Sequence, residues 1–184
     1  MSLFFPTQTQ KVFDDLSADE LKKAGVRLLL CDIDNTLAPY EEPLPSERVR
    51  TFLSALSAAG IRVAFLSNNH EERVSLFCRE LDLPYRRDAR KPLPGRAKKF
   101  IRSLGATPLT TLFLGDQIFT DVWAGHAAGI YSILIKPISE EKDEWITKTK
   151  RGLEKQVLAR YRLRPLSRRH GMKTDKALMK VDGH

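Results

Sequence analysis

Residues 28–37 have the sequence Leu-Leu-Leu-Cys-Asp-Ile-Asp-Asn-Thr-Leu, an apolar run that ends in two aspartates one residue apart. A short apolar run followed directly by acidic and turn-forming residues is typical of a buried parallel strand, and open α/β sheets bind ligands beyond the carboxyl ends of such strands. Side chains two positions apart on an extended segment point to the same side. We therefore expect Asp32 and Asp34 to be close enough to share one cation or one reacting group.

On both sides of this run, apolar segments alternate with segments of helical spacing. A capping-box pattern at Ser17 predicts a short helix before the first strand. Further strands are expected at 61–66, 111–114 and 131–135, and helices after Ser46, through 74–81, through 97–104 and over 120–128. Strands and helices that alternate through short connections predict an α/β fold, a Rossmann-like three-layer α/β/α sandwich with a central parallel sheet.

Polar residues worth explaining follow the ends of these segments. Asp32 and Asp34 come after the first strand, Ser67 after the second, and Asp116 after the later strand at 111–114. Taken singly, each has an ordinary structural explanation as a turn residue, a helix cap or a solvated charge. Together they are expected to converge on one crevice at the carboxyl edge of the sheet.

In this order the motifs resemble those of phosphatases of the haloacid dehalogenase superfamily. The first motif is matched by residues 32–36, the second by Ser67, the third by Lys91-Pro92 and the fourth by residues 115–121. The resemblance covers roughly residues 26–136. Within this superfamily, the chain more specifically resembles the capless subclass III and its bacterial YqeG-like subfamily, which is related to mitochondrial phosphatidylglycerophosphate phosphatases.

The resemblance implies hydrolysis through an aspartyl-phosphate, which splits one difficult displacement into two easier ones. We expect Asp32 to be the nucleophile, and the family assigns Asp34 the role of general acid and then base. Two carboxylates would repel a phosphate dianion, so a hard cation with oxygen ligands is needed, and Mg²⁺ fits. The ligands that the resemblance implies are the Asp32 carboxylate, the Asp34 main-chain carbonyl and Asp116.

Fixed donors must also meet the charge on the transferring phosphoryl group. The motifs imply that Ser67 supplies a hydroxyl and Lys91 a point charge, and we expect Lys91 to lower the pKa of Asp32 as well. Asp121 is expected to orient Lys91 or a metal-bound water. Asn35 stands where many relatives have glycine, and we expect it to tolerate a left-handed backbone there.

The spacing of the motifs leaves no room for a cap domain. Asp32 and Ser67 are 35 positions apart, and Ser67 and Lys91 are 24 positions apart. A loop and one helix fill the first interval, and a helix and a short link fill the second. An uncapped site is expected to accept a phosphate displayed on something large, such as a lipid bilayer, a protein or a nucleic acid end.

The net charge of +8 is concentrated at the carboxyl end. Residues 150–184 hold 11 Lys and Arg against three acidic residues, so residues 1–149 are neutral overall. A second basic stretch at 86–102 has eight Lys and Arg, opposed by Asp88 alone. Both stretches favour a polyanionic partner, whether a phosphorylated substrate, an anionic lipid surface or a nucleic acid bound by the tail. A solvated tail that only aids solubility is an equal alternative for the last 20 or so residues.

No apolar run approaches the roughly 20 residues of a membrane span, and the first residues lack the pattern of a signal peptide. We expect a cytoplasmic protein, with peripheral association at the inner membrane surface as a hypothesis. Three parts are predicted: a leader with a short helix at 1–25, a phosphatase core at 26–149, and a basic helix and tail at 150–184, whose order the sequence does not determine.

The function that this sequence predicts is a Mg²⁺-dependent phosphomonoester hydrolase, with phosphatidylglycerophosphate as the suggested substrate. Two alternatives stay open. One is an RNA- or ribonucleoprotein-associated binding protein on an inherited core, and the other is a capless phosphatase for a soluble sugar or nucleotide phosphate. Retention of both aspartates, Lys91 and Asp116 favours catalysis over binding alone. The sequence does not indicate the oligomeric state.

Overall fold

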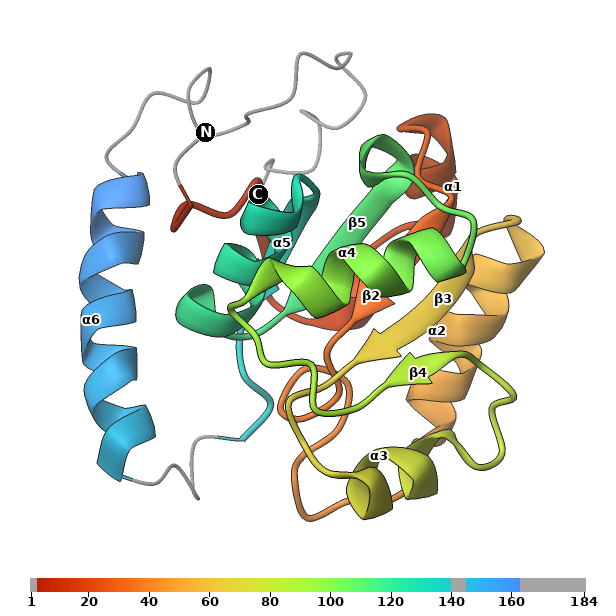
Figure 1. The fold of residues 1–184 in the computed structure, drawn as a ribbon, viewed down its shortest axis with the longest axis horizontal. Helices are drawn as coiled ribbons and strands as arrows, with labels where there is room; N and C mark the ends of the chain where they lie inside the picture. The colour runs from red at the N-terminus through yellow and green to blue at the C-terminus, as the bar shows by residue number, and fades with distance from the viewer. Residues whose placement is uncertain (1–2, 140–144, 163–184) are drawn as a thin grey trace.

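A computed structural model describes residues 3–139 and 145–162 of this chain, with the backbone alone for 145–151. Within these residues, six strands form one parallel sheet in the order β1-β6-β5-β2-β3-β4, and helices cover both faces (Figure 1). The strands are β1 Gln8–Gln10, β2 Leu28–Cys31, β3 Arg62–Leu66, β4 Tyr85–Arg86, β5 Thr111–Gly115 and β6 Tyr131–Ile135. The predicted three-layer α/β/α architecture with a parallel sheet is confirmed.

Strand β2 lies at the centre of the sheet, between β3 and β5. Its register places Leu28 beside Arg62 on one side and Thr111 on the other. Because these three strands run in parallel and start level, their carboxyl ends are also level. The segments that follow β2, β3 and β5 therefore leave the sheet side by side, which is where the predicted site residues occur.

The side chains of β2 alternate between two apolar clusters, one on each face. Leu29 and Cys31 belong to one cluster, and Leu28 and Leu30 to the other; all four are fully buried. Residues of α1 Ala18–Lys23, α2 Glu47–Ala58 and α3 Glu71–Cys78 pack into the first cluster. Residues of α4 Pro94–Ser103 and α5 Trp123–Ala128 pack into the second. Burial on both faces explains why this strand is apolar at every position.

Local sequence signals set the ends of several helices. The Ser46 hydroxyl accepts a hydrogen bond from the Val49 N–H at 3.4 Å at the start of α2, and Ser17 caps α1 in the same way through Glu20. Gly60 follows α2 with a φ of 81°, a left-handed conformation that glycine adopts without strain. The predictions of these two helices are confirmed.

Two strands and one turn were not predicted. Strand β1 lies in the segment expected to be a leader with one helix, and it pairs with β6 at the edge of the sheet. Strand β4 has only two residues and pairs with β3. The helix predicted over 120–128 is instead a π-helical turn, η3 Ile118–Val122, followed by α5. The turn brings Asp121 back to the edge of the sheet, where it accepts a hydrogen bond from the Gln117 N–H.

The helix expected from residue 150 begins earlier, because α6 spans Trp145–Arg162 (Figure 1). Val157 and Leu158 of this helix pack on an apolar cluster that also contains Phe4, Phe119 and Leu134. The rest of the predicted basic tail, 163–184, lies outside the described residues. No helix in the described part of the chain is long and apolar enough to span a bilayer.

Candidate active site

A cavity of about 680 Å³ opens at the carboxyl edge of the sheet. Four predicted site residues line it, namely Asp32, Asp34, Ser67 and Lys91. The other residues that line it are Asn35, Tyr40, Glu41, Asn68, Asn69, His70, Gln117, Thr120 and Ser139. The two remaining predicted residues, Asp116 and Asp121, are buried beside Asp32. The structure therefore brings all six predicted side chains to one place.

The ammonium group of Lys91 lies between two carboxylates. Its Nζ donates to Asp32 Oδ1 at 2.6 Å and to Asp121 Oδ1 at 2.7 Å, and the ring of Phe113 lies 5.6 Å away. The three polar side chains are 8% exposed or less. A buried ammonium needs such partners because an unpaired charge in the interior is costly. Asp121 thus has the contact with Lys91 that the sequence suggested.

The main chain of Lys91 is fixed by Asn68, which follows β3. The Lys91 N–H donates to Asn68 Oδ1 at 2.7 Å, and Asn68 Nδ2 donates to the Lys91 carbonyl at 3.0 Å. This pair of bonds matches the donor and acceptor of one amide with those of another. These two bonds hold the segment before α4 against the end of β3. Lys91, which lies in that segment, is thereby placed within reach of Asp32 at the end of β2.

Burial and charge act in opposite directions on Asp32. Burial raises the pKa of Asp32 to about 7, Lys91 opposes this increase, and the negative charges of Asp121 and Asp34 add to it. Lys91 lowers the pKa of Asp32, as the sequence suggested, but burial has the larger effect and the net pKa is raised. Burial lowers the pKa of Lys91, but Asp121 and Asp32 outweigh it and raise the pKa above its ordinary value.

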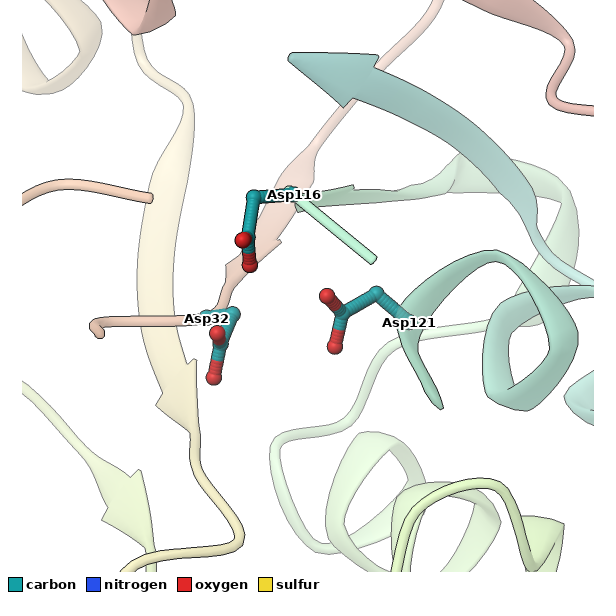
Figure 2. Close-up of side chains that lie close together, drawn as sticks. All are labelled: Asp32, Asp116 and Asp121. Atoms are coloured by element: carbon teal, nitrogen blue, oxygen red, sulfur yellow. The ribbon is translucent and has the colours of Figure 1, made fainter. Parts of the chain in front are cut away.

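Three carboxylates form a cluster suited to a metal ion. Asp32, Asp116 and Asp121 each offer an oxygen, and these oxygens lie within 4.8 Å of one another. Figure 2 shows the three side chains converging from the ends of β2 and β5 and from the turn after β5. The Thr36 hydroxyl lies 3.5 Å from Asp32 Oδ2 and 3.3 Å from Asp116 Oδ1. Three converging carboxylate oxygens are the kind of ligand set that a hard divalent cation such as Mg²⁺ prefers.

The carboxylate of Asp34 has a different set of partners. Arg73 Nε donates to its Oδ1 at 3.0 Å, while Asn69 Nδ2 and the Ser67 hydroxyl approach its Oδ2 at 3.3 and 3.5 Å. Asp32 and Asp34 thus face one cavity, as predicted from their spacing. However, their side chains pair with different cations, Lys91 and Arg73.

The turns that carry the aspartates depend on a left-handed residue in one case and on a side-chain cap in the other. Asn35 has a φ of 59°, which confirms the left-handed conformation expected at this position. Glu154 of α6 is buried, and its Oε1 accepts hydrogen bonds from the N–H groups of Ile118 at 2.7 Å and Phe119 at 3.2 Å. A carboxylate at these N–H groups stabilises the start of the turn that carries Asp121.

Several residues with a place in this site were not predicted. They are Thr36, Asn68, Asn69, Arg73 and Glu154. Asn68 and Asn69 directly follow Ser67 and Thr36 lies within the first motif, so position alone could have suggested them. Arg73 and Glu154 have no such signal, because each is one charged residue on a helix that also carries other charged residues.

Comparison with known proteins agrees with the motifs. A family model described as haloacid dehalogenase-like hydrolase matches residues 6–129. The chain is 31% identical over 156 residues to the probable phosphatase YqeG of Bacillus subtilis, covering 85% of this chain and 90% of that protein. It is 26% identical over 150 residues to phosphatidylglycerophosphate phosphatase 1, chloroplastic/mitochondrial, of Arabidopsis thaliana, covering 77% of this chain and 43% of the plant protein.

Among solved structures, the cobalt-bound deoxy-D-mannose-octulosonate 8-phosphate phosphatase of Haemophilus influenzae is similar, with a TM-score of 0.52 and 14% identity. That match covers 88% of this chain and 99% of the other. At this level of identity the likeness concerns the fold alone. It agrees with the parallel sheet and its two helical layers.

Proposed function

The chain belongs to the haloacid dehalogenase-like hydrolases and is a phosphatase, and from this premise we propose that it hydrolyses phosphomonoesters through an aspartyl-phosphate on Asp32, with Mg²⁺ as cofactor and phosphatidylglycerophosphate as substrate. One observation carries the proposal. The Asp32 carboxylate lies at a cavity, 2.6 Å from the Lys91 ammonium and within a cluster of three buried carboxylates. A structural ion pair would not need two further acids beside it.

The proposed reaction has two displacements at phosphorus. In the first, an oxygen of the Asp32 carboxylate bonds to phosphorus, the bond from phosphorus to the ester oxygen breaks, and that oxygen takes the proton of the Asp34 carboxyl group. In the second, Asp34 accepts a proton from a water whose oxygen bonds to phosphorus. The bond from phosphorus to Asp32 then breaks, which releases inorganic phosphate and regenerates the Asp32 carboxylate.

The neighbouring side chains each have a task in this scheme. Lys91 and the Ser67 hydroxyl are positioned to donate to the phosphoryl oxygens, where charge accumulates in the transition state. Asp32, Asp116 and the Asp34 main-chain carbonyl would hold Mg²⁺, with Asp121 in the same cluster. When bound, the cation would offset the repulsion between these carboxylates and the phosphate dianion.

Features of the cavity support a substrate larger than a free metabolite. Residues 32–91 are all described, and they contain no inserted domain that would cover the site. Exposed Tyr40 and His70 lie at the cavity. His70 Nδ1 is 3.4 Å from Asp88, and Asp88 lines a second hollow of about 500 Å³ with Glu71, Tyr85, Arg86, Arg87 and Arg96. Three arginines against two acidic residues leave this hollow with a net positive charge, which suits a phosphate carried by an anionic surface.

The lipid substrate is supported further by the name of the Arabidopsis relative. Nucleic-acid binding by the basic tail stays a prediction, because residues 163–184 lie outside the described part of the chain. Peripheral association with a membrane is part of the lipid proposal, and it requires no helix that crosses the bilayer.

The test is phosphate release from phosphatidylglycerophosphate in mixed micelles, with Mg²⁺ or with a chelator, for the wild-type protein and Asp32→Asn. Soluble glycerol 3-phosphate serves as the matched substrate without a lipid. We expect metal-dependent release that is faster for the lipid and is lost in the variant. Release by a folded Asp32→Asn protein would contradict the assigned nucleophile, and equal or faster release from glycerol 3-phosphate would contradict the lipid substrate.

A further inference from the structure

Arg73, near the start of α3, has its guanidinium group buried against the site. Its side chain is 11% exposed. Nε donates to Asp34 Oδ1 at 3.0 Å, Nη1 donates to the Pro43 carbonyl at 3.1 Å, and Nη2 donates to the Pro39 carbonyl at 3.3 Å. Arg73 therefore joins the Asp34 carboxylate to the loop at 37–45, called here the proline loop.

Aromatic rings complete the surroundings of this guanidinium. Its central carbon lies 5.6 Å from the centre of the Phe77 ring and 6.0 Å from that of Tyr40. Tyr40 belongs to the proline loop and lines the cavity, whereas Phe77 is fully buried in the core. A planar group with several N–H donors can bond to three acceptors and stack on rings at the same time, which the single ammonium of a lysine cannot do.

These contacts give the two oxygens of Asp34 different roles. Oδ1 is occupied by Arg73, whose other nitrogens are held by the loop. Oδ2 is the oxygen near the Ser67 hydroxyl and Asn69 Nδ2, and both of these residues line the cavity. A carboxyl group that must deliver a proton to an ester oxygen needs one oxygen presented to the substrate and its other oxygen fixed.

We propose that Arg73 is a positioning residue that fixes Asp34 through Oδ1, so that Oδ2 gives the proton to the leaving oxygen, and that it anchors the proline loop at the mouth of the cavity. This inference rests on the proposed function of Asp34. According to this proposal, one arginine both orients the Asp34 carboxyl group and holds the loop that carries Tyr40 in position.

The leaving group separates this role from a purely structural one. An alkoxide needs a proton to leave, whereas a nitrophenolate leaves without one. We expect Arg73→Met to lower kcat/KM about 100-fold for glycerol 3-phosphate, the scale of a misplaced catalytic group, and less than about fivefold for p-nitrophenyl phosphate. The comparison uses kcat/KM because it reports the first displacement, whereas the second, in which Asp34 is the base, is common to both esters and affects kcat. Arg73→Lys, which keeps the charge, should recover part of the loss. Equal losses on both esters would overturn the assignment.

A double variant gives a second test. If Arg73 acts through Asp34, then Asp34→Asn combined with Arg73→Met should hydrolyse glycerol 3-phosphate no more slowly than Asp34→Asn alone, because residues that act as a unit are not additive. Multiplied losses would overturn the proposal. Arg50→Met is the matched control, since Arg50 pairs with Glu80 at the surface, away from the site, and its loss should leave both activities unchanged.

The loop anchor has its own measurement, which needs no activity. We expect hydrogen exchange of the 37–45 amides to be faster in Arg73→Met than in the wild-type protein and in Arg50→Met. Unchanged exchange would overturn the anchor. If the wild-type protein hydrolysed neither of these esters nor phosphatidylglycerophosphate, the proposed function would fail, and the exchange data would still decide whether Arg73 holds the loop.

Discussion

Replacing Gly115 with alanine should damage the site far more than a single methyl group suggests. Gly115 ends β5, directly before Asp116. A Cβ at this position would lie 2.4 Å from the Cβ of Asp121 and 2.5 Å from its Oδ2. Because the closest atom is a Cβ, which is fixed to the backbone, rotation of the Asp121 side chain cannot relieve the contact. The turn that carries Asp121 has to move.

The size of the effect follows from these distances. Ordinary contacts of a Cβ begin near 3.4 Å, so the two groups must separate by about 1 Å, and a misplacement of that size costs about 10²-fold in rate. The displaced Asp121 carries one of the two carboxylates bonded to Lys91. Overpacking of this kind also costs about 1–3 kcal/mol of unfolding free energy. For a chain of this length that lowers the Tm by about 2–12 °C.

The assay compares kcat/KM for p-nitrophenyl phosphate and thermal unfolding in Gly115→Ala and Gly125→Ala. Gly125 is also buried, but an added Cβ there would lie 3.4 Å from the Cβ of Phe113 and 3.6 Å from Cγ1 of Ile130, which are ordinary contacts. Alanine within helix α5 should be neutral or stabilise by about 0.5–1 kcal/mol. We expect activity to fall about 100-fold in Gly115→Ala and to stay unchanged in Gly125→Ala. Wild-type activity in a folded Gly115→Ala protein would refute this view of the turn.

The charges and contacts of the site lead to four further predictions. The apparent affinity for Mg²⁺ should rise with pH by up to about tenfold per unit below the Asp32 pKa of about 7, because the ion must displace the proton on Asp32, and it should level off above that pH. Calorimetric titrations with Mg²⁺ across this pH range measure the affinity, and an affinity that does not change with pH would contradict the prediction. In the metal-free protein the same raised pKa favours the protonated fold, so the free energy of unfolding should fall as the pH rises from the ordinary value of 3.8 to about 7. Lys91→Met should abolish activity and lower the free energy of unfolding by about 3–5 kcal/mol, because it leaves Asp32 and Asp121 without their cation. Denaturant unfolding should show a smaller loss of stability at acidic pH than at alkaline pH. An equal loss at both would count against the ion-pair explanation. Glu154→Leu should slow the reaction and lower the free energy of unfolding by about 1–3 kcal/mol for each N–H group left without its acceptor. Glu154→Gln keeps an acceptor oxygen and should stay near wild type. Thermal unfolding and kcat are measured for the two variants, and identical behaviour would exclude the capping role.

The sequence predicts this fold well wherever apolar pattern and local capping agree. Leu28–Cys31 is apolar at every position because both faces of β2 are covered, and Ser46 and Gly60 mark the ends of α2. Strand β1 carries no such pattern. Its residues Gln8–Gln10 are held by backbone pairing with β6, which depends on the sheet and not on their side chains.

The site shows the same division. Asp32, Ser67 and Asp116 directly follow expected strands, so their convergence follows from a parallel sheet. Lys91 lies between β4, which was not predicted, and α4, so its place was suggested by the motif alone. The role of Arg73 depends on how close the proline loop comes to α3, which no local pattern encodes.

The pKa of Asp32 could not be predicted from its neighbours in sequence. It depends on the depth of burial as well as on the presence of Lys91. Its direction therefore needed the packed structure.

The central claim is that Asp32 carries the phosphoryl group. The most direct measurement quenches the reaction during turnover, reduces the acyl phosphate with borohydride and sequences the tryptic peptide 28–48 by mass spectrometry. This peptide contains both Asp32 and Asp34. The account predicts homoserine at position 32 and unmodified Asp34. Homoserine at position 34, or no modified peptide while p-nitrophenyl phosphate is being hydrolysed, would contradict it.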